Sequence, residues 1–380
     1  MHRRHWRSAT AILLVTSTGA YAAGNDDRVF ALEQRVAELE AQLQNDDGPN
    51  FSFGSGVQTE VEFYGYIKVD AVYDFGAELG NTTFGLVGLT GDDGDEYFNA
   101  TAQQTRLGFR TTTPTALGEL GTQVEIDFYG GTGAFSTEDP YDPRVRHANV
   151  TLGGFLIGKD WTTFMPISSY PITLDFQGVA GIPFARQEQI RYTHEAGNFI
   201  TELALEESNG DSDHPVGIAA IAYDTDPLLV RLSGLYGSVN DGLGGSEDAY
   251  GINLSTTAQL WEGATLDAAY TYGEGIASYL VFLGDDVDAD GDAIEQQSAY
   301  LGVAQEFGEK WTARAIYGYR ENETGASDAT ESLSSFHLNA QYDIVENTTV
   351  GVEYFHGTRD TFGGGSYDVD RIQASVQYNF

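Results

Sequence analysis

The chain has 380 residues, with 57 acidic against 19 basic side chains and a formal net charge of −38. Such a charge makes nucleic acid a poor partner, because the phosphate backbone would be repelled. The chain has no cysteine, which excludes a disulfide scaffold and thiol chemistry, while 46 glycines, 22 tyrosines and only nine prolines favour an all-β chain with many turns.

The first 23 residues predict a signal peptide. Three arginines lie within residues 1–7, an apolar run follows at 9–15, and small residues end in Ala20-Tyr21-Ala22. This order is typical of secretory signals that are cleaved after a short A-x-A motif. The alternative, a membrane anchor, would need about 20 apolar residues to cross the bilayer. We therefore expect export and cleavage near residue 22 or 23.

Residues 24–50 predict a periplasmic coiled-coil helix followed by a linker. Apolar side chains recur at alternating steps of three and four over about two heptads, as an a/d seam does. Asn45–Asn50 contains Gly48 and Pro49 and is typical of a linker. The alternative is a single amphipathic helix packed on the rest of the protein. The seam residues are Val29, Leu32, Val36, Leu39 and Leu43.

Residues 51–380 alternate between apolar and polar side chains with a period of two. Phe63, Ile67 and Val69 share one face of the first strand, and Lys68 and Asp70 share the other. About sixteen such segments, separated by short turns and long polar loops in alternation, predict a transmembrane antiparallel β-barrel. A soluble β-sandwich or propeller is the alternative, but its apolar faces would have to meet in a packed core, whereas the many charges on the opposite faces suit a water-filled lumen.

No motif of enzyme chemistry is present. The sequence lacks G-x-S-x-G, H-E-x-x-H, a P-loop and a Cys–His pair, so we expect neither catalysis nor a cofactor. The basic residues are more informative. Of the fourteen that follow residue 50, seven lie between Arg106 and Arg191. A charge facing lipid costs about 2–4 kcal/mol at the bilayer midplane, so we expect these side chains to face the lumen. They could also form ion pairs with Glu125 and Asp127, and both roles are expected.

The segment of about residues 160–186 breaks the alternation. It contains three prolines and several aromatic residues but few charges, which is unusual for an exposed loop of an acidic protein. We predict that it folds into the lumen and narrows it, facing the basic strip. The predicted pore-constriction residues are Arg106, Arg110, Arg144, Arg146, Lys159, Trp161, Asp175, Arg186 and Arg191.

Acidic residues gather in the predicted loops. Asp286, Asp288 and Asp290 resemble the first half of a calcium-binding loop, but Gln297 stands where the twelfth-position glutamate is needed. We do not predict a metal site here, although these three aspartates are weak candidates for one. Bridging of divalent ions to lipopolysaccharide, or simple solvation, is the preferred interpretation.

Five short stretches resemble the DcaP-like porin family: Tyr64–Ala71, Arg106–Phe109, Arg146–Ala148, Gly158–Phe164 and Arg191–Tyr192. The resemblance implies a homotrimeric sixteen-stranded porin of the bacterial outer membrane, with its N-terminal helix in the periplasm. It also implies passage of small organic acids such as aromatic dicarboxylates. The residues themselves predict passive diffusion with a preference for anions and carboxylates. The alternative is a structural or adhesive surface barrel with acidic extracellular loops and a plugged lumen.

Overall fold

The computed structural model describes residues 51–53, 57–76, 78–83, 96–131, 141–281 and 284–380. The predicted signal peptide (1–23) and coiled coil (24–50) lie outside this set. No helix within the described residues has the length and hydropathy to cross a membrane.

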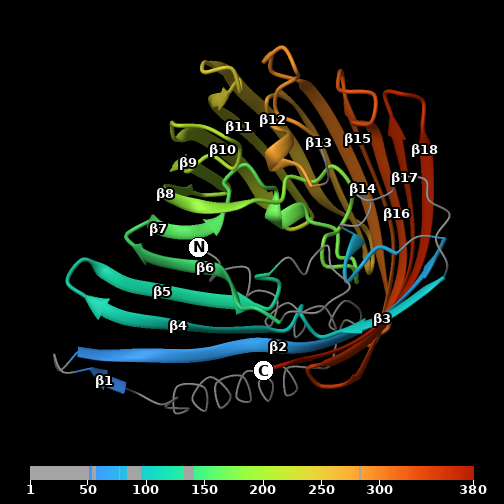
Figure 1. Cartoon of the computed structure of the whole chain (residues 1–380). Coiled ribbons are helices and arrows are strands. Elements are labelled where there is room, and N and C mark those ends of the chain that lie inside the picture. The colour runs from blue at the N-terminus through green and yellow to red at the C-terminus, as the bar shows by residue number, and fades with distance from the viewer. Residues whose placement is uncertain (1–50, 54–56, 77, 84–95, 132–140, 282–283) are drawn as a thin grey trace.

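The strands form one closed antiparallel barrel of sixteen wall strands (Figure 1), as the sequence predicted. β3 and β4 pair with successive parts of β2 and together make one wall strand, whereas β1 pairs only with the start of β2. β18 pairs with β2 and closes the ring. The strands are β1 (Phe51–Phe53), β2 (Val57–Phe75), β3 (Tyr97–Thr101), β4 (Arg106–Thr115), β5 (Gly118–Asp127), β6 (Arg144–Leu152), β7 (Phe155–Trp161), β8 (Arg186–Ala196), β9 (Phe199–Glu206), β10 (Val216–Thr225), β11 (Leu228–Asn240), β12 (Ser246–Trp261), β13 (Ala264–Glu274), β14 (Glu295–Phe307), β15 (Trp311–Asn322), β16 (Thr330–Val345), β17 (Thr348–Thr361) and β18 (Ser366–Asn379).

The alternation of side chains sorts the two faces of the wall. On β2, Phe63, Ile67 and Val69 are exposed on the outside, whereas Lys68 and Asp70 are buried inside. Large apolar side chains that would be buried in a water-soluble protein here form the outer surface, as lipid requires. The polar face is therefore enclosed, and the functional residues must be sought there.

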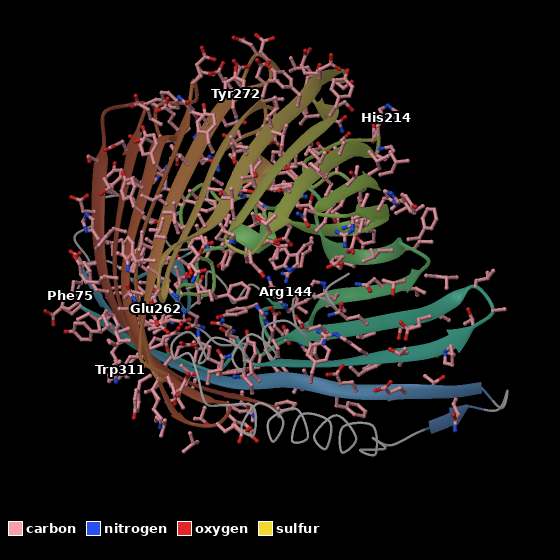
Figure 2. The ribbon with its side chains drawn as sticks, turned by 180° about the vertical axis from the view of Figure 1, so that it is seen from behind. Phe75, Arg144, His214, Glu262, Tyr272 and Trp311 are labelled. Atoms are coloured by element: carbon pink, nitrogen blue, oxygen red, sulfur yellow. The ribbon has the colours of Figure 1, made fainter. Side chains whose placement is uncertain are left out.

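The wall is tall on one side and low on the other (Figure 1). β12 and β16 have 16 residues each, whereas β6, β7 and β9 have nine, seven and eight. Figure 2 shows Glu262 and Trp311 near one end of the barrel and His214 and Tyr272 near the other. The low side lies next to the segment that leaves the wall between β7 and β8.

Among the described residues, two of the connections that fold into the barrel lie against each other, and a further inward stretch, residues 78–83 after β2, adds Leu79 to their shared apolar cluster. The first, which we call the inward segment, is residues 162–185 between β7 and β8; it includes the short helix Ile167–Ser169. The second is residues 275–281 between β13 and β14, including the short helix Ala277–Tyr279, which the sequence did not predict to fold inward. The two are joined where Val281 N–H donates to the Ile182 carbonyl at 2.8 Å and Phe184 N–H donates to the Tyr279 carbonyl at 2.9 Å.

The inward segment packs against the inner face of the tall wall. Val179 and Ile182 are fully buried in an apolar cluster with Ile316 and Phe355. On β15, Gly318 allows this approach, because a Cβ there would meet Val179 and the carbonyl of Ala180. The open part of the lumen is therefore displaced toward the low wall.

Candidate functional site

Four arginines form a cluster on the inner face of the low wall. Arg106 begins β4, Arg144 and Arg146 begin β6, and Arg186 begins β8. Two carboxylates of β5 tie three of them together. Asp127 lies 2.6 Å from Arg144 and 3.0 Å from Arg146. Glu125 lies 2.7 Å from Arg146 and 3.9 Å from Arg106.

Aromatic rings cover this arginine cluster. The guanidinium of Arg186 stands 4.5 Å from the centroid of Trp161, and that of Arg146 stands 5.7 Å from the same ring. Phe176, from the inward segment, lies 5.4 Å from Arg144 and 5.6 Å from Arg146. Figure 2 shows Arg144 directed toward the barrel interior. The cluster thus lies between the low wall and the inward segment, with its guanidinium groups against aromatic rings.

The arginine cluster carries more positive than negative charge. Four guanidinium groups face two carboxylates, Glu125 and Asp127, which leaves a formal excess of two positive charges. Arg186 Nη1 and Arg106 Nε are buried without a hydrogen-bond acceptor among the described residues. A buried donor without a partner is costly unless a solute or water supplies the acceptor. These two N–H groups are suited to receive an anion.

Two further predicted residues take part in ion pairs of the wall. Arg110 lies 3.9 Å from Glu62 and stacks 3.9 Å from the centre of the Tyr64 ring. Arg191 lies 3.1 Å from Asp160 and 3.9 Å from Glu202. Both side chains face inward. Of the two roles expected for the basic residues, these two take part in ion pairs with carboxylates of the wall.

Asp175 anchors the inward segment to the opposite wall. Its carboxylate lies 3.6 Å from Arg371, which itself pairs with Asp74 at 2.6 Å. It also accepts the N–H of Thr83 at 2.8 Å. Glu353 holds the neighbouring backbone by accepting the N–H groups of residues 174 and 175 at 2.9 and 3.2 Å. Asp175 therefore helps to fix the position of the inward segment.

Side chains of four wall strands hold the rest of the inward segment. The bonds are Ser233 Oγ to the Phe164 carbonyl (3.2 Å), Tyr300 Oη to the Ser169 carbonyl (3.0 Å), Asn339 Nδ2 to the Ile172 carbonyl (3.1 Å), Ser298 Oγ to the Gly181 carbonyl (2.6 Å), Ala180 N–H to Ser335 Oγ (2.8 Å) and Leu174 N–H to Glu353 (2.9 Å).

A cavity of about 510 Å³ adjoins the arginine cluster inside the barrel. Arg106 and Trp161 reach it from the low wall, and Asp175 from the inward segment. Three basic residues that the sequence interpretation missed also line it: Lys68, Lys310 and Arg314. The signal for Arg314 was present, because it lies between Ala313 and Ala315 on the polar face of its strand. Lys310 lies in the turn between β14 and β15, where the alternation of polar and apolar residues does not predict which way a side chain faces.

Lys159 does not belong to the lumen, and its prediction as a constriction residue was wrong. Its neighbour Asp160 is buried on the inner face, and Lys159 pairs across the ladder with Glu188 on the outer face. The two side chains lie 3.2 Å apart, and that of Glu188 is 58% exposed. The rule that charges avoid the outer wall misplaced this residue, because an outward partner is available.

The weak calcium candidates are engaged in local hydrogen bonds. Asp286 accepts the N–H of Ser278 at 2.9 Å, and burial raises the pKa of its carboxyl. Asp288 accepts the N–H groups of Asp290 and Asp292 at 2.9 and 3.0 Å. Within the described part of the chain, no three metal-ligating side chains come close enough to hold an ion.

Comparison with known proteins identifies related sequences and folds. The family model described as DcaP outer membrane protein matches residues 31–380. Porin Omp2a of Brucella melitensis biotype 1 is 28% identical over 222 residues, or 54% of this chain and 56% of the relative. Porin Omp2b of Brucella abortus is 25% identical over 210 residues, or 54% and 53%. The chain thus spans about half the length of these curated relatives.

Two solved structures share the fold. The outer membrane channel DcaP of Acinetobacter baumannii superposes with a TM-score of 0.76 at 24% identity, covering 87% of this chain and 99% of that one. The anion-selective porin from Comamonas acidovorans gives 0.60 at 17% identity, covering 85% and 100%. The related proteins are described as porins or as a channel, which agrees with the expectation that this chain is not an enzyme.

Proposed function

The chain belongs to the DcaP outer membrane protein family, and from this premise we propose that it is a passive porin for small hydrophilic solutes that prefers anions. The family and the barrel place it in the outer membrane. Diffusion through a water-filled lumen needs no cofactor and no moving part.

The observation that carries the anion preference is the positive excess along the narrow part of the lumen. The arginine cluster has four cations against two carboxylates. The adjoining cavity, which Arg106 also lines, adds three further cations, Lys68, Lys310 and Arg314, against Asp175 and Asp343. Such an excess lowers the free energy of an anion and raises that of a cation in the same place.

The chemistry of the cluster favours carboxylates among anions. Guanidinium groups bind carboxylates with two parallel N–H donors, and Arg186 and Arg106 have donors to offer. Trp161 lies beside Arg186 and Phe176 lies beside Arg144, and these flat apolar rings suit organic acids that carry an aromatic or aliphatic body. The solved porin from Comamonas acidovorans is itself named anion-selective.

The strongly acidic total charge does not oppose this proposal. Many acidic side chains lie in loops such as 207–213 and 285–292, outside the strands that carry the arginine cluster. Salt screens their field over about 8 Å at physiological ionic strength. The local charge at the constriction then decides the selectivity, while the loops face the surrounding solution and lipopolysaccharide.

Assembly as a homotrimer, with residues 24–50 as a periplasmic coiled coil, is part of the same proposal. OmpT of Vibrio cholerae, which shares the fold with a TM-score of 0.56, is described in a trimer form. A helix with an a/d seam would join copies below the barrels.

A plugged structural barrel is the second candidate, and one observation favours it. The two inward connections bury an apolar cluster that includes Val179, Ile182 and Val281 inside the barrel. This cluster closes the tall-wall side of the lumen. The cavity beside the low wall is the remaining path, so measurable conductance decides between the two candidates.

The experiment is reconstitution of the purified protein in planar bilayers. Under a KCl gradient, an anion-preferring pore gives a zero-current potential of the sign set by chloride. Cation preference would overturn the anion proposal, and absence of conductance would favour the plugged barrel. Competition of chloride current by mono- and dicarboxylates then ranks the solutes, because a bound carboxylate slows chloride.

A further inference from the structure

One strand of the low wall turns two consecutive side chains into the lumen. Between β5 and β6 the register shifts by one residue, since Glu125 pairs with His147 whereas the next residue, Ile126, pairs with Val145. Arg146 is therefore the extra residue of a β-bulge. Val145 is 47% exposed on the outer face, whereas Arg146 and His147 are only 1% and 6% exposed on the inner face.

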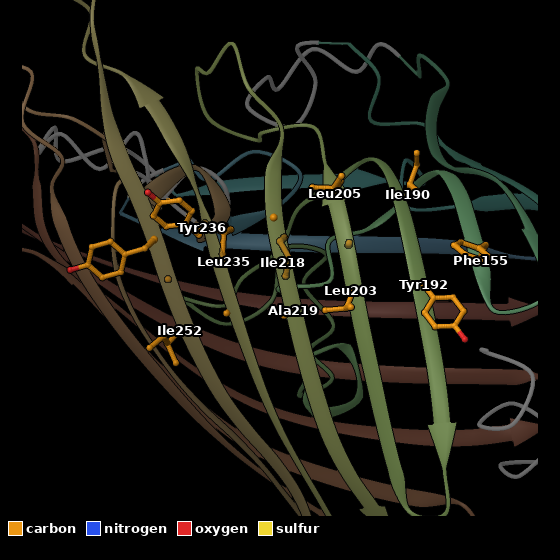
Figure 3. Close-up of a pocket in the computed structure, with 15 residues that line it drawn as sticks. Phe155, Ile190, Tyr192, Leu203, Leu205, Ile218, Ala219, Leu235, Tyr236 and Ile252 are labelled. Atoms are coloured by element: carbon orange, nitrogen blue, oxygen red, sulfur yellow. The ribbon is translucent and has the colours of Figure 1, made fainter.

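The neighbouring strands show what the bulge changes. On β7, β8 and β9 every second side chain stays on the outer face, as Phe155, Ile190 and Leu205 do in Figure 3. With the same regular alternation on β6, His147 would face outward once Arg146 faces the lumen. The bulge thus brings a titratable ring into the inner wall, beside the arginine cluster.

Charged groups of five strands surround this ring, directly or through a shared carboxylate. They are Arg106 (β4), Glu125 (β5), Arg146 (β6), Asp160 (β7) and Arg191 (β8). Asp160 lies 2.8 Å from Nδ1 of His147, and Glu125 lies 3.9 Å from its Nε2. The shorter contact lacks hydrogen-bond geometry, so the carboxylate of Asp160 acts on the ring through its charge.

The two carboxylates beside the ring already have cationic partners. Glu125 lies 2.7 Å from Arg146, and Asp160 lies 3.1 Å from Arg191. A proton on His147 therefore adds a positive charge that these ion pairs do not cancel. The arginine cluster has four guanidinium groups against two carboxylates, so protonation of His147 raises the formal excess of positive charge beside the lumen from two to three.

His147 is placed for this role, unlike the other histidines of the described residues. His194, His214 and His356 lie on the outer face or in a loop, and His337 is fully buried on the tall wall beside Glu353. The ring of His147 instead meets that of Trp161 at 6.1 Å, and Trp161 covers the arginine cluster. Histidine is also the side chain whose charge ordinarily changes between about pH 5 and 8.

We propose that His147 is a specificity-determining residue, whose protonation strengthens the preference of the pore for anions as pH falls. The inference rests on the proposed porin function and adds a regulation of the same site. A solute need not touch the ring, because the field of one charge extends over about 8 Å at physiological ionic strength.

The test is the zero-current potential across a KCl gradient at about pH 8 and about pH 5, in bilayers of a zwitterionic lipid. In the unsubstituted protein the anion-to-cation permeability ratio should rise about two-fold in acid. His147→Gln should show no such rise, because glutamine cannot take up the proton. His147→Arg carries a fixed charge and should give a high ratio at both pH values. His194→Gln, the matched control on the outside of β8, should keep the rise.

Two results would overturn the inference and leave the anion preference standing. One is a ratio that does not change with pH in the unsubstituted protein, and the other is an equal rise in His147→Gln. If His147→Gln forms no channels, an equal rise in His147→Arg decides against His147 in the same way. Cation preference at both pH values, or no conductance at all, would instead overturn the porin proposal and this inference together.

Discussion

Neutralising Arg186 gives the most direct measure of what the arginine cluster does. Arg186 forms no ion pair with a described carboxylate, and its Nη1 has no acceptor among the described residues. Replacing it by glutamine therefore removes one charge without leaving a buried carboxylate unpaired, which would cost about 3–5 kcal/mol. The barrel should remain folded, and the change in selectivity should report the charge alone.

The size of the effect follows from Coulomb's law. A unit charge about 7 Å from a passing ion contributes about 0.6 kcal/mol at the dielectric constant of water. The anion loses this stabilisation and the cation is relieved of the same repulsion, so the difference between them changes by about 1.2 kcal/mol, or about eight-fold in the permeability ratio. Near 0.1 M salt, screening reduces this to about three-fold.

The assay is the zero-current potential of single channels across a KCl gradient at low and moderate salt. We expect Arg186→Gln to lower the anion-to-cation permeability ratio, and more so at low salt. Lys159→Gln is the matched control, because it removes the same charge from the outer face. An unchanged ratio for Arg186→Gln, or an equal change for Lys159→Gln, would refute the reasoning.

Four further predictions follow from other contacts. Glu353→Leu leaves two backbone N–H groups of the inward segment unpaired, so urea unfolding should show a loss of about 2–4 kcal/mol and single-channel currents should become noisier. Gly318→Ala forces the inward segment away from the wall and should cost about 1–3 kcal/mol in the same assay, whereas Gly217→Ala, with no other atom nearer than 3.8 Å, should cost less. Arg314→Gln should lower the permeability ratio in the same direction as Arg186→Gln, because Arg314 lines the cavity. In the loop after β11, backbone N–H groups hold the pKa of Asp241 below its ordinary value, so these bonds are kept above that pKa and lost as pH falls through it. The protection of the amides in residues 241–245 against exchange, relative to their intrinsic rates at each pH, should therefore fall in acid, and in Asp241→Asn it should not follow this titration.

Each of these expectations can fail on its own. Equal stability and current noise in Glu353→Leu and the unsubstituted protein would mean that the segment is held elsewhere. Equal losses for Gly318→Ala and Gly217→Ala would contradict the close approach on β15. An unchanged permeability ratio in Arg314→Gln would mean that the arginine cluster alone sets the selectivity. Protection of the amides around Asp241 that stays the same as pH falls would mean that its carboxylate does not hold the turn.

The barrel itself was predictable because its two solvents differ so strongly. Side chains along each strand face lipid and lumen in turn, so the polarity of residues such as Ile67 and Lys68 predicts which face of the wall each occupies. The same rule assigned Arg106, Arg144 and Arg146 to the inside correctly. It could not identify their partners, because those depend on which strands become neighbours and in what register.

The misplacements share a physical cause. Lys159 was assigned inward on the cost of a lone charge in lipid, but Glu188 across the ladder supplies a counter-charge. The inward fold of residues 275–281 was missed because a connection carries no period of its own. Residues 275–281 fold inward because the backbones of Val281 and Tyr279 hydrogen bond to the inward segment (162–185), which is about a hundred residues away in the chain.

The six bonds that hold the inward segment have a consequence for how the channel is controlled. They come from strands β11, β14, β16 and β17 and are spread along its length. Releasing them together, at about 1 kcal/mol each, would cost about 6 kcal/mol, so a swung-out segment would be present in only about one molecule in 25,000. The opening beside the inward segment would therefore keep one size rather than open and close. In the proposed porin, solute entry would then scale with the number of copies in the membrane and with the concentration gradient across it.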